Sequence, residues 1–376
     1  MKLIHLSDLH LGKHVNGYSL LEDQEFILKR ILQILSEETP DAIIIAGDIY
    51  DKPIPSAEAV RVFDDFLYSL SRRSLPVFII SGNHDSPERI SFASRILGNA
   101  GVYLSPVYSG QILPISLNDT YGTIDFYLLP FIKPAVVRKF FPEDAITTYN
   151  DAVSAALRSV NLDRNHRNVL IAHQFFAGAE QCESEEISVG GSEAVDHEIA
   201  DEFDYVALGH LHGPQSVGRP EVRYCGSPLM YSFSEIHHKK SLTVVEIREK
   251  GSITITTRDL VPLRTMREIR GTYMELASKA FYEGTDTEDY LRVILLDEND
   301  IPDAIRRLRT IYPNIMSLEY DNLRTRTRMQ IEPVLEAELR SPLELFDDFY
   351  RKQNGTGLDD EQRAYLDQRV EEIWRV

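Results

Sequence analysis

The sequence predicts a layered α/β fold, and three observations support that class. Five short apolar stretches are rich in aliphatic and β-branched residues, as in strands that are buried on both faces. They are residues 3–6, 42–46, 77–80, 169–172 and 205–208. Helical patterns lie between several of them, and such alternation implies crossover connections. Each stretch also runs directly into a residue type that can bind a metal ion, at the strand end where α/β sheets bind ligands.

Two amphipathic patterns predict helices between the first three strands. Residues 22–38 and residues 56–71 both carry apolar side chains at helical spacing. Ser86 followed by Pro87 is typical of an N-cap and a first helical residue. We therefore expect a third helix over residues 87–97.

A change of pattern near residue 260 predicts a second domain. Residues 241–248 and 252–258 alternate apolar and polar side chains around a short turn, which predicts a β-hairpin that closes the first domain. The elements expected next are strand 265–270, helix 273–281, strand 290–296, helix 301–311 and strand 315–320. The expected organisation is a first domain over residues 1–262, a small α/β domain over 263–330, and a linker with a helical tail over 331–376.

Length and composition limit the class of protein. With 376 residues, 43% of them hydrophobic, the chain can form a large domain with appendages. No apolar run is long enough to span a membrane, and His5, Asp8 and His10 interrupt the N-terminal segment. We therefore expect neither a membrane span nor a signal peptide, and a cytoplasmic protein. Cys182 and Cys225 suit a reducing compartment, where a disulfide between them is disfavoured, so we interpret both as structural.

The formal net charge of −19 argues against a nucleic-acid ligand only if the charge is evenly spread. Residues 261–330 instead carry nearly equal numbers of basic and acidic side chains, and most of the basic ones are arginines. Two divalent ions would also outweigh the carboxylates of Asp8 and Asp48 and leave a positive site in an acidic protein. The acidic balance therefore does not exclude a phosphate-bearing substrate.

Five motifs follow the predicted strands. They are Ser7-Asp8-Leu9-His10, Gly47-Asp48, Gly82-Asn83-His84-Asp85, Ala172-His173 and Gly209-His210-Leu211-His212. Asp8 and His10 point to the same side if the chain remains extended between them, and His210 and His212 repeat that spacing. The glycine before three of these ligand groups permits a sharp turn that aims a side chain, or a backbone, at a small ion.

The candidate ligands are two carboxylates, one amide oxygen and four imidazoles. They are Asp8, Asp48, Asn83, His10, His173, His210 and His212. This mixture of oxygen and nitrogen suits Mn, Fe or Zn better than Ca or Mg. Any one motif alone is more typical of a hydrogen-bonded structural residue, but five in series favour a two-metal phosphoesterase site. The alternative is a degenerate relative that keeps the residues without the chemistry.

The order of these motifs resembles that of the calcineurin-like metallophosphoesterases. A closer resemblance, to the SbcD family of bacterial nucleases, rests on three features. They are the opening residues 4–12, the pair Gly226-Ser227-Pro228 and Phe233-Ser234-Glu235, and an acidic helical tail. The resemblance covers essentially the whole chain, with specific motifs in the first 240 residues. It implies a four-layer α-β-β-α sandwich with a small α/β capping domain.

The resemblance also implies roles for the site residues. One ion would be held by Asp8, His10, Asp48 and His212, and the other by Asp48, Asn83, His173 and His210. His84 would contact the scissile phosphate and help the leaving oxygen to depart, with Asp85 orienting it. A structural role is the alternative for His84. The expected cofactor is two divalent metal ions, with Mn²⁺ the expected metal.

Two groups of side chains near the C-terminus are candidates for contacts with macromolecules. The candidate phosphate contacts are Arg306, Arg307, Arg309, Arg324, Arg326 and Arg328. In the family the capping domain guides DNA; the alternative is an appendage whose charges are solvated. Apolar stripes on two expected tail helices contain Leu345, Phe346, Phe349, Tyr350, Val370 and Ile373. These stripes either pack on the parent domain or, as the resemblance implies, dock an SbcC-type ATPase.

Together with the resemblance, these observations favour a metal-dependent DNA nuclease. The resemblance implies exonuclease activity on double strands and endonuclease activity on single strands and hairpins. It would act as a dimer with an SbcC-type ATPase in DNA end processing, repair and recombination. By family resemblance alone, helices 56–71 and 87–97 would form the dimer face. Two alternatives remain. One is a stand-alone phosphatase or cyclic-nucleotide phosphodiesterase, but such an enzyme needs neither the arginine-bearing domain nor a docking tail. The other is a non-catalytic scaffold of the same fold, but a scaffold needs no complete set of metal ligands.

Overall fold

The computed structural model describes residues 1–182, 185, 194–322, 346, 347, 350, 358, 362, 363, 365 and 366. By packing, the chain divides into two compact units. The first comprises residues 1–269, 282–293 and 305–318, and the second comprises 270–281, 294–304 and 319–376. The domain boundary expected after residue 262 rests on sequence pattern rather than on packing, and it stays a prediction.

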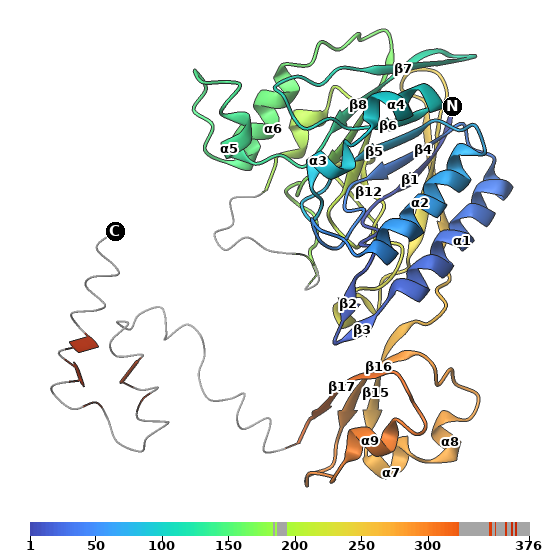
Figure 1. The fold of residues 1–376 in the computed structure, drawn as a ribbon, viewed down its shortest axis with the longest axis vertical. Coiled ribbons are helices and arrows are strands. Elements are labelled where there is room, and N and C mark those ends of the chain that lie inside the picture. Colours follow the sequence, from blue (N-terminus) through green and yellow to red (C-terminus); the bar gives the residue numbers. More distant parts are fainter. Residues whose placement is uncertain are drawn as a thin grey trace. The chain divides into compact units, whose positions relative to one another are not determined.

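The first of two six-stranded sheets contains three of the five predicted ligand-bearing strands. Its order is β14-β13-β1-β4-β5-β6 (Figure 1). The strands are β1 (Lys2–Leu6), β4 (Ala42–Ala46), β5 (Val77–Ile80), β6 (Val102–Leu104), β13 (Ser241–Ile247) and β14 (Ile253–Asp259). The last two form the expected antiparallel hairpin, and β1, β4, β5 and β6 run parallel.

The second sheet contains the other two predicted ligand-bearing strands. Its order is β11-β12-β10-β9-β8-β7. The strands are β7 (Ile115–Asp119), β8 (Gly122–Leu129), β9 (Arg167–His173), β10 (Tyr205–Gly209), β11 (Gln215–Val217) and β12 (Arg219–Tyr224). Strands β8, β9, β10 and β12 are parallel, and β7 and β11 are antiparallel to their neighbours at the two edges.

Helices cover the outer face of each sheet. They are α1 (Leu21–Glu38), α2 (Ala57–Ser71), α5 (Pro134–Val137) and α6 (Tyr149–Arg158). One apolar cluster joins α1 and α2 to the first sheet, and a second joins α5 and α6 to the second sheet. A third cluster fills the space between the sheets. The layers are therefore helix, sheet, sheet and helix, as the family resemblance implies.

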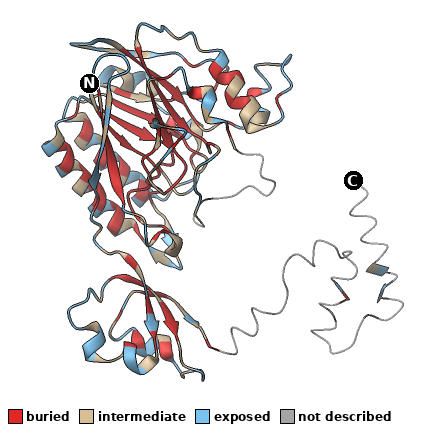
Figure 2. Cartoon of the chain, turned by 180° about the vertical axis from the view of Figure 1, so that it is seen from behind, coloured by how far each residue is buried: buried red, intermediate tan, exposed pale blue. Residues whose placement is uncertain are grey.

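The alternation of side chains along each strand explains why the ligand-bearing strands are mostly apolar. In neighbouring strands β1 and β4, Leu3 and Ile44 face the other sheet, whereas Ile4 and Ile43 face the helices. All four side chains are 0% exposed. Both faces of each strand lie in a core, so apolar side chains fill nearly every position. His5 in β1 is a buried exception, and its Nδ1 lies 2.9 Å from the Tyr205 hydroxyl. Figure 2 shows the inner strands of the sheets coloured as buried along most of their length.

The expected helix over residues 87–97 is wrong in its length. The structure has two single-turn helices instead, α3 (Pro87–Ile90) and α4 (Ser94–Leu97). Ser86 caps the first, as predicted. Ala93 separates them with a φ of 59°, a left-handed conformation that cannot continue a right-handed helix.

Three strands and three short helices form the region predicted from residue 265 onward. The strands are β15 (Met266–Gly271), β16 (Tyr290–Leu295) and β17 (Ile315–Tyr320), in that order in one sheet. The helices are α7 (Tyr273–Leu276), α8 (Lys279–Tyr282) and α9 (Ala304–Leu308). The single helix expected over 273–281 is divided between α7 and α8, where the backbone amide and the hydroxyl of Ser278 both donate to the Glu275 carbonyl, at 3.0 Å and 2.7 Å.

The remaining elements are short. They are the hairpin β2 (His14–Val15) with β3 (Tyr18–Ser19), and the 3₁₀ turns η1 (Gly98–Ala100), η2 (His197–Ala200) and η3 (Phe233–Glu235). Within the described residues, none of the helices combines the length and the apolar character that crossing a membrane requires.

Arg167 ties the two sheets together at one end of the strands. It begins β9, is 2% exposed, and is paired with Asp119 at 2.6 Å and 3.0 Å. Its guanidinium also donates to the carbonyl oxygens of Ile247 and Arg248 at the end of β13 in the other sheet. Burial alone would raise the pKa of Asp119, but Arg167 and the amino terminus outweigh it and hold that pKa well below its ordinary value.

We expect Arg167→Met to lower the free energy of unfolding by about 3–5 kcal/mol, because it leaves buried acceptors and a carboxylate without their cation. The measurement is urea unfolding of the full chain. Arg158→Met is the matched control, since the Arg158–Asp144 pair is largely exposed and should contribute less than about 1 kcal/mol. Equal, small losses in both variants would show that Arg167 does not tie the sheets.

Candidate metal centre

The structure brings all seven predicted ligands to the carboxyl ends of five parallel strands. Three ligand groups follow β1, β4 and β5 of the first sheet, and two follow β9 and β10 of the second. The ligand side chains are buried, with Asn83 only partly so. The centre therefore depends on both sheets, and packing of the sheets face to face is what joins its two halves.

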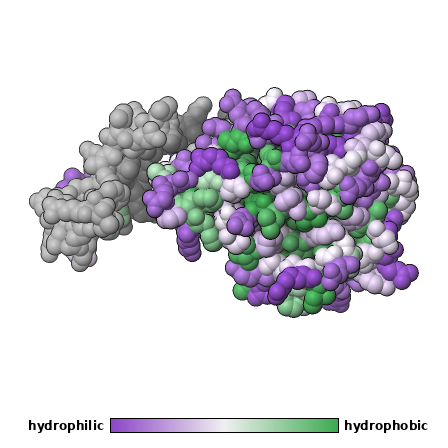
Figure 3. Space-filling view, turned by 90° about the horizontal axis from the view of Figure 1, so that it is seen from above, coloured by the Kyte–Doolittle hydropathy of each residue, from purple (hydrophilic) through white to green (hydrophobic). Residues whose placement is uncertain are grey.

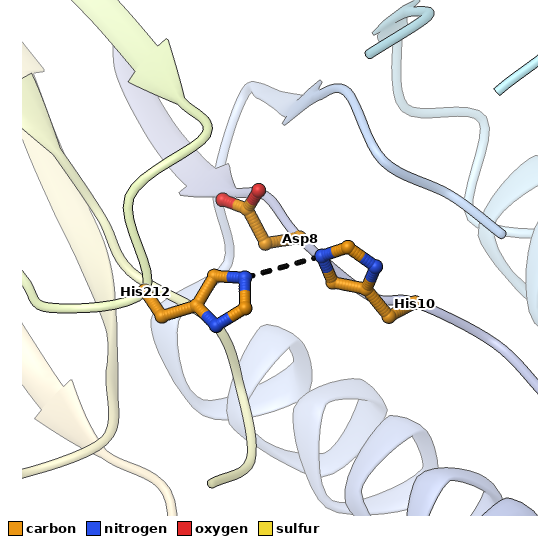
Figure 4. A group of neighbouring side chains, drawn as sticks. All are labelled: Asp8, His10 and His212. Atoms are coloured by element: carbon orange, nitrogen blue, oxygen red, sulfur yellow. Dashed lines mark hydrogen bonds between the residues drawn. The ribbon is translucent and has the colours of Figure 1, made fainter. Parts of the chain in front are cut away.

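One group of donors consists of Asp8, His10 and His212. The Nε2 atoms of the two imidazoles lie 3.2 Å apart and face each other beside the Asp8 carboxylate (Figure 4). One donor atom from each of the three residues lies within 4.8 Å of the others. Two imidazole nitrogens that meet beside a carboxylate are the arrangement expected of ligands that share a cation.

A second group of donors surrounds the Asn83 side chain. Its Oδ1 lies 3.0 Å from His173 Nε2 and 3.1 Å from His210 Nδ1. Asp48 reaches both groups with the same oxygen, because its Oδ2 lies 3.3 Å from His173 Nε2 and 3.5 Å from His10 Nε2. Asp48 therefore lies between the two groups of donors, and its role as a bridging ligand stays a prediction.

Several ligands have a backbone conformation that L residues seldom adopt. The φ angles are 54° at Asp8, 43° at His10, 48° at Asp48 and 104° at His210. The expectation that the chain stays extended from Asp8 to His10 is therefore wrong. The backbone amides of these two residues instead donate to the carbonyls of Gly47 and Asp48, which turns both side chains toward the centre. Strained backbone of this kind is concentrated at functional sites.

The three glycines at the ligand motifs have two different roles. Gly47 has a φ of 91°, so it makes the predicted sharp turn. Gly82 and Gly209 do not have positive φ and are required for space instead. A Cβ at Gly82 would lie 2.1 Å from Asp48 Oδ1, and one at Gly209 would lie 2.0 Å from the carbonyl oxygen that ends β4.

Buried partners fix the orientation of two imidazoles. His173 Nδ1 donates to the Ala46 carbonyl at 2.8 Å, which leaves Nε2 free to face Asp48 and Asn83. His212 Nδ1 lies 3.2 Å from Glu235 Oε1, which likewise leaves Nε2 for His10. Such outer partners set the tautomer and raise the basicity of ligand imidazoles.

Glu235 is itself held by a buried cation, Lys240. The Lys240 ammonium lies 2.5 Å from Glu235 Oε2 and also donates to the His212 carbonyl at 2.9 Å and to Ser227 Oγ at 2.8 Å. Burial alone would raise the pKa of Glu235, but His212 and Lys240 outweigh it and hold that pKa well below its ordinary value. Sequence reasoning noted Glu235 only as part of a family motif and gave no role to Lys240.

A neighbouring serine holds the Asp8 carboxylate. Ser7 Oγ donates to the Asp8 carboxylate and lies 3.0 Å from Cys225 Sγ. Cys225 is buried and is not in a disulfide, and neither is Cys182, which is partly exposed. Cys225 therefore packs behind the centre, as a structural residue does.

The charges of the donor set favour cations. Burial raises the pKa of Asp8 to about 6; the Asp48 carboxylate acts in the same direction, and His173 and His212 oppose it. Burial would lower the pKa of His173, but Asp48 and Asp8 outweigh it and raise that pKa to about 9. Burial lowers the pKa of His210 to about 3 and that of His10 well below its ordinary value, so these rings are neutral and have lone pairs available. Neutral imidazoles beside carboxylates and an amide oxygen fit divalent transition-metal ions.

His84 lies beside the ligands without joining the Asn83 group. Its backbone amide donates to Asp48 Oδ1 at 2.9 Å, and its ring centroid lies 4.8 Å from that of His10. Its Nδ1 lies 3.1 Å from the Asp51 carbonyl oxygen. The side chain is only partly buried, so the ring borders both the centre and the solvent.

The prediction that Asp85 orients His84 is wrong. The Asp85 carboxylate instead accepts from three backbone amides, those of Ile49, Tyr50 and Gly82, at 3.0–3.1 Å. These hydrogen bonds hold the loop after Asp48 against the loop before Asn83. The partner that orients the His84 ring is the Asp51 carbonyl.

The predicted contacts with macromolecules are only partly within the described residues. Arg306 and Arg307 are exposed on α9, and Arg309, also exposed, donates to the Ile315 carbonyl at 2.8 Å. Outside the described residues are Arg324, Arg326, Arg328, Leu345, Phe349, Val370 and Ile373. Phe346 is 42% exposed, and Tyr350 is partly buried.

We expect Glu235→Gln to weaken binding of Mn²⁺ to the full chain by about 10–100-fold, because it removes the charge that orients and polarises His212. Isothermal titration with MnCl₂ measures the change. Glu202→Gln, at an exposed residue paired with Arg164, is the matched control and should bind Mn²⁺ as the unmodified protein does. If Glu235→Gln lowers the melting temperature but binds Mn²⁺ normally, Glu235 supports the fold rather than the metal.

Comparisons with known proteins identify the family of the chain. Residues 1–214 match the family model described as calcineurin-like phosphoesterase, and residues 262–354 match the one described as type 5 capsule protein repressor C-terminal domain. The SbcD component of nuclease SbcCD from Staphylococcus epidermidis is 36% identical over 85% of this chain and 85% of its own. The corresponding protein of Staphylococcus saprophyticus is 34% identical over 98% of this chain and 97% of its own.

Similarity to solved structures is weaker. The structure of a dimetal phosphatase from Danio rerio aligns with 69% of this chain and 96% of its own, at 10% identity and a TM-score of 0.41, a likeness too low to support the assignment. The family match over more than half of the chain and the two curated relatives are sufficient to assign the chain to a family. The chain belongs to the calcineurin-like phosphoesterases and, within them, to the SbcD family of metal-dependent nucleases.

Proposed function

We propose that this chain is a DNA nuclease that hydrolyses phosphodiester bonds with two metal ions, as exonuclease on double strands and endonuclease on single strands and hairpins. The observation that supports it best is the pair of donor groups that share Asp48. We assign Asp8, His10, Asp48 and His212 to one ion and Asp48, Asn83, His173 and His210 to the other. The mixed oxygen and nitrogen donors support Mn²⁺ as the metal.

The bound ions would supply hydroxide near neutral pH and stabilise the negative charge of the phosphate in the transition state. The side chains of the protein would position the phosphate and supply the proton for the leaving oxygen. The Asp51 carbonyl oxygen can only accept a hydrogen bond, so His84 Nδ1 must carry the proton that it donates to Asp51. A proton given to the leaving oxygen must therefore come from Nε2, which carries one only when the ring is protonated. His84 would therefore act as general acid in its imidazolium form.

DNA is the proposed substrate because of the regions beyond the phosphoesterase core. The curated relatives that cover most of this chain are named as parts of a nuclease. Arg306 and Arg307 are exposed cations in the small α/β region, which we propose as a capping domain over residues 263–330. A small-molecule phosphodiesterase has no use for such a region.

The proposed partners are an SbcC-type ATPase, through the tail over residues 331–376, and a second copy of this chain. For the second copy, the region of α2, α3 and α4 leaves Tyr68 62%, Phe92 79% and Ile96 73% exposed. Figure 3 shows apolar residues gathered in patches among polar ones on the surface seen from above. The proposed setting is DNA end processing, repair and recombination in the cytoplasm.

We expect His84→Ala to keep both metal ions yet to lose about 10²–10⁴-fold in nuclease activity, because it removes a proton donor rather than a ligand. The assay is Mn²⁺-dependent digestion of linear and hairpin DNA, with bis(p-nitrophenyl) phosphate in parallel and metal content by mass spectrometry. His237→Ala, at an exposed histidine, is the matched control, and Asp48→Ala should lose both ions.

Three outcomes would contradict the proposal. If metal content falls with activity in His84→Ala, that residue is a ligand or a structural residue. If the unmodified protein hydrolyses the small ester but not DNA, with or without the ATPase, it is a stand-alone phosphodiesterase. If it binds metal and hydrolyses neither substrate, it is a scaffold.

We expect the double variant Phe346→Ser with Phe349→Ser to weaken binding to an SbcC-type ATPase by about 10²–10⁴-fold, since each buried Phe contributes about 1.5–3 kcal/mol. Co-purification and titration calorimetry measure the loss. Leu113→Ser, at a residue 74% exposed in the phosphoesterase region, is the control. A lower melting temperature with normal partner binding would show that the stripe packs on its own chain.

A further inference from the structure

The edge of the second sheet that supplies His173 and His210 also carries an aromatic residue, Phe131. It follows β8, which pairs in parallel with β9, so Phe131 and His173 leave neighbouring strands at the same edge. The Phe131 amide donates to the Ser81 carbonyl at 2.9 Å, in the segment that leads to Asn83. Strand β8 thus ends at the metal centre as β9 and β10 do, but it contributes an aromatic ring rather than a metal ligand.

The ring of Phe131 lies beside metal ligands rather than in a core. Its centroid is 6.4 Å from those of His210 and His173, with 23° between the ring planes for His210 and 82° for His173. Tyr149 is a further ring neighbour, at 6.0 Å. Within the described part of the chain, Phe131 belongs to none of the three apolar clusters, and its side chain is only partly buried. A single exposed aromatic residue is common, but this one borders the place where a substrate phosphate would bind.

This position suits a flat group attached to the reacting phosphate. In a nucleic-acid strand that group is a base, and every base has a face on which an aromatic side chain can stack. Lys133, two residues after Phe131, is exposed, and its side chain has no hydrogen bond or ion pair among the described residues. Its charge is therefore available to a phosphate of the same strand. An aromatic ring next to an available cation is the combination that proteins use to hold single strands.

We propose that Phe131 stacks on the base of a nucleotide next to the scissile phosphate, on the side of the centre formed by His173 and His210. This role rests on the proposed nuclease function and adds a substrate preference to it. A base that is paired and stacked within a duplex has no free face for the ring, whereas an unpaired base has one. Phe131 therefore favours cleavage at single strands, hairpin loops and frayed ends.

A single-stranded oligonucleotide with a central run of abasic nucleotides tests this contact on the full chain. The run keeps the sugars and phosphates and lacks only the bases. Phe131→Ala should lower kcat/KM for Mn²⁺-dependent cleavage of an ordinary single strand by about 10–100-fold, the typical effect of one stacked base. The same variant should cleave within the abasic run at a rate within about twofold of the unmodified protein. Phe131→Tyr keeps the ring and should restore most of the activity on the ordinary strand.

The matched control is Tyr121→Ala, at the opposite end of β8, where Tyr121 is 45% exposed. It should cleave both strands as the unmodified protein does, and titration calorimetry should show normal Mn²⁺ binding in all variants. Equal losses on both strands or weaker Mn²⁺ binding in Phe131→Ala would show that the ring supports the ligands, and no loss on either strand would show that it touches no base. Each of these results overturns the stacking role.

Failure of the proposed function has a different signature. An unmodified protein that hydrolyses bis(p-nitrophenyl) phosphate but cleaves neither strand is not a nuclease, and the stacking role falls with that function. An unmodified protein that cleaves both strands equally well is a nuclease that does not use the base, and only the stacking role is overturned.

Discussion

The position of Asp48 is the constraint on which the metal centre depends. Its backbone carbonyl accepts from His10, its Oδ1 accepts from the His84 amide, and its Oδ2 faces the donors of both groups. That position exists because β4 lies between β1 and β5 in one sheet and packs face to face against the strands of the other. A shift of either sheet by one residue would turn Asp48 away from one donor group.

The sequence predicts the parts of this arrangement that arise from local pattern. Strands such as β4 and β5 are apolar at every position because both faces are buried. The residues at which they begin and end, and the candidate ligands that follow, could therefore be identified from the sequence. The division of the helix over 87–97 could not be, because Ala93 is an ordinary helix former and its left-handed φ is imposed by tertiary structure. The orientation of Asp85 likewise depends on two loops that meet only in the folded chain.

The outer support of the centre illustrates a second limit. Glu235 and Lys240 are distant in sequence from most of the ligands, and a glutamate near a lysine is commonplace on a protein surface. What distinguishes this pair is burial, with Glu235 0% and Lys240 6% exposed. Burial of that kind follows from the packing of the segment after β12 against His212 and against the core of the first sheet, which periodicity alone does not specify. A paired buried charge is thus a sign of function that only the fold makes visible.

The surroundings of Lys240 have a consequence for the side chain that this position can hold. An ammonium group has three N–H bonds in a tripod, and here each has its own acceptor: the His212 carbonyl, Ser227 Oγ and Glu235 Oε2. Arginine carries the same charge, but its donors lie in one plane and cannot point to three acceptors arranged around a point. The geometry therefore selects for the shape of the cation as well as its charge.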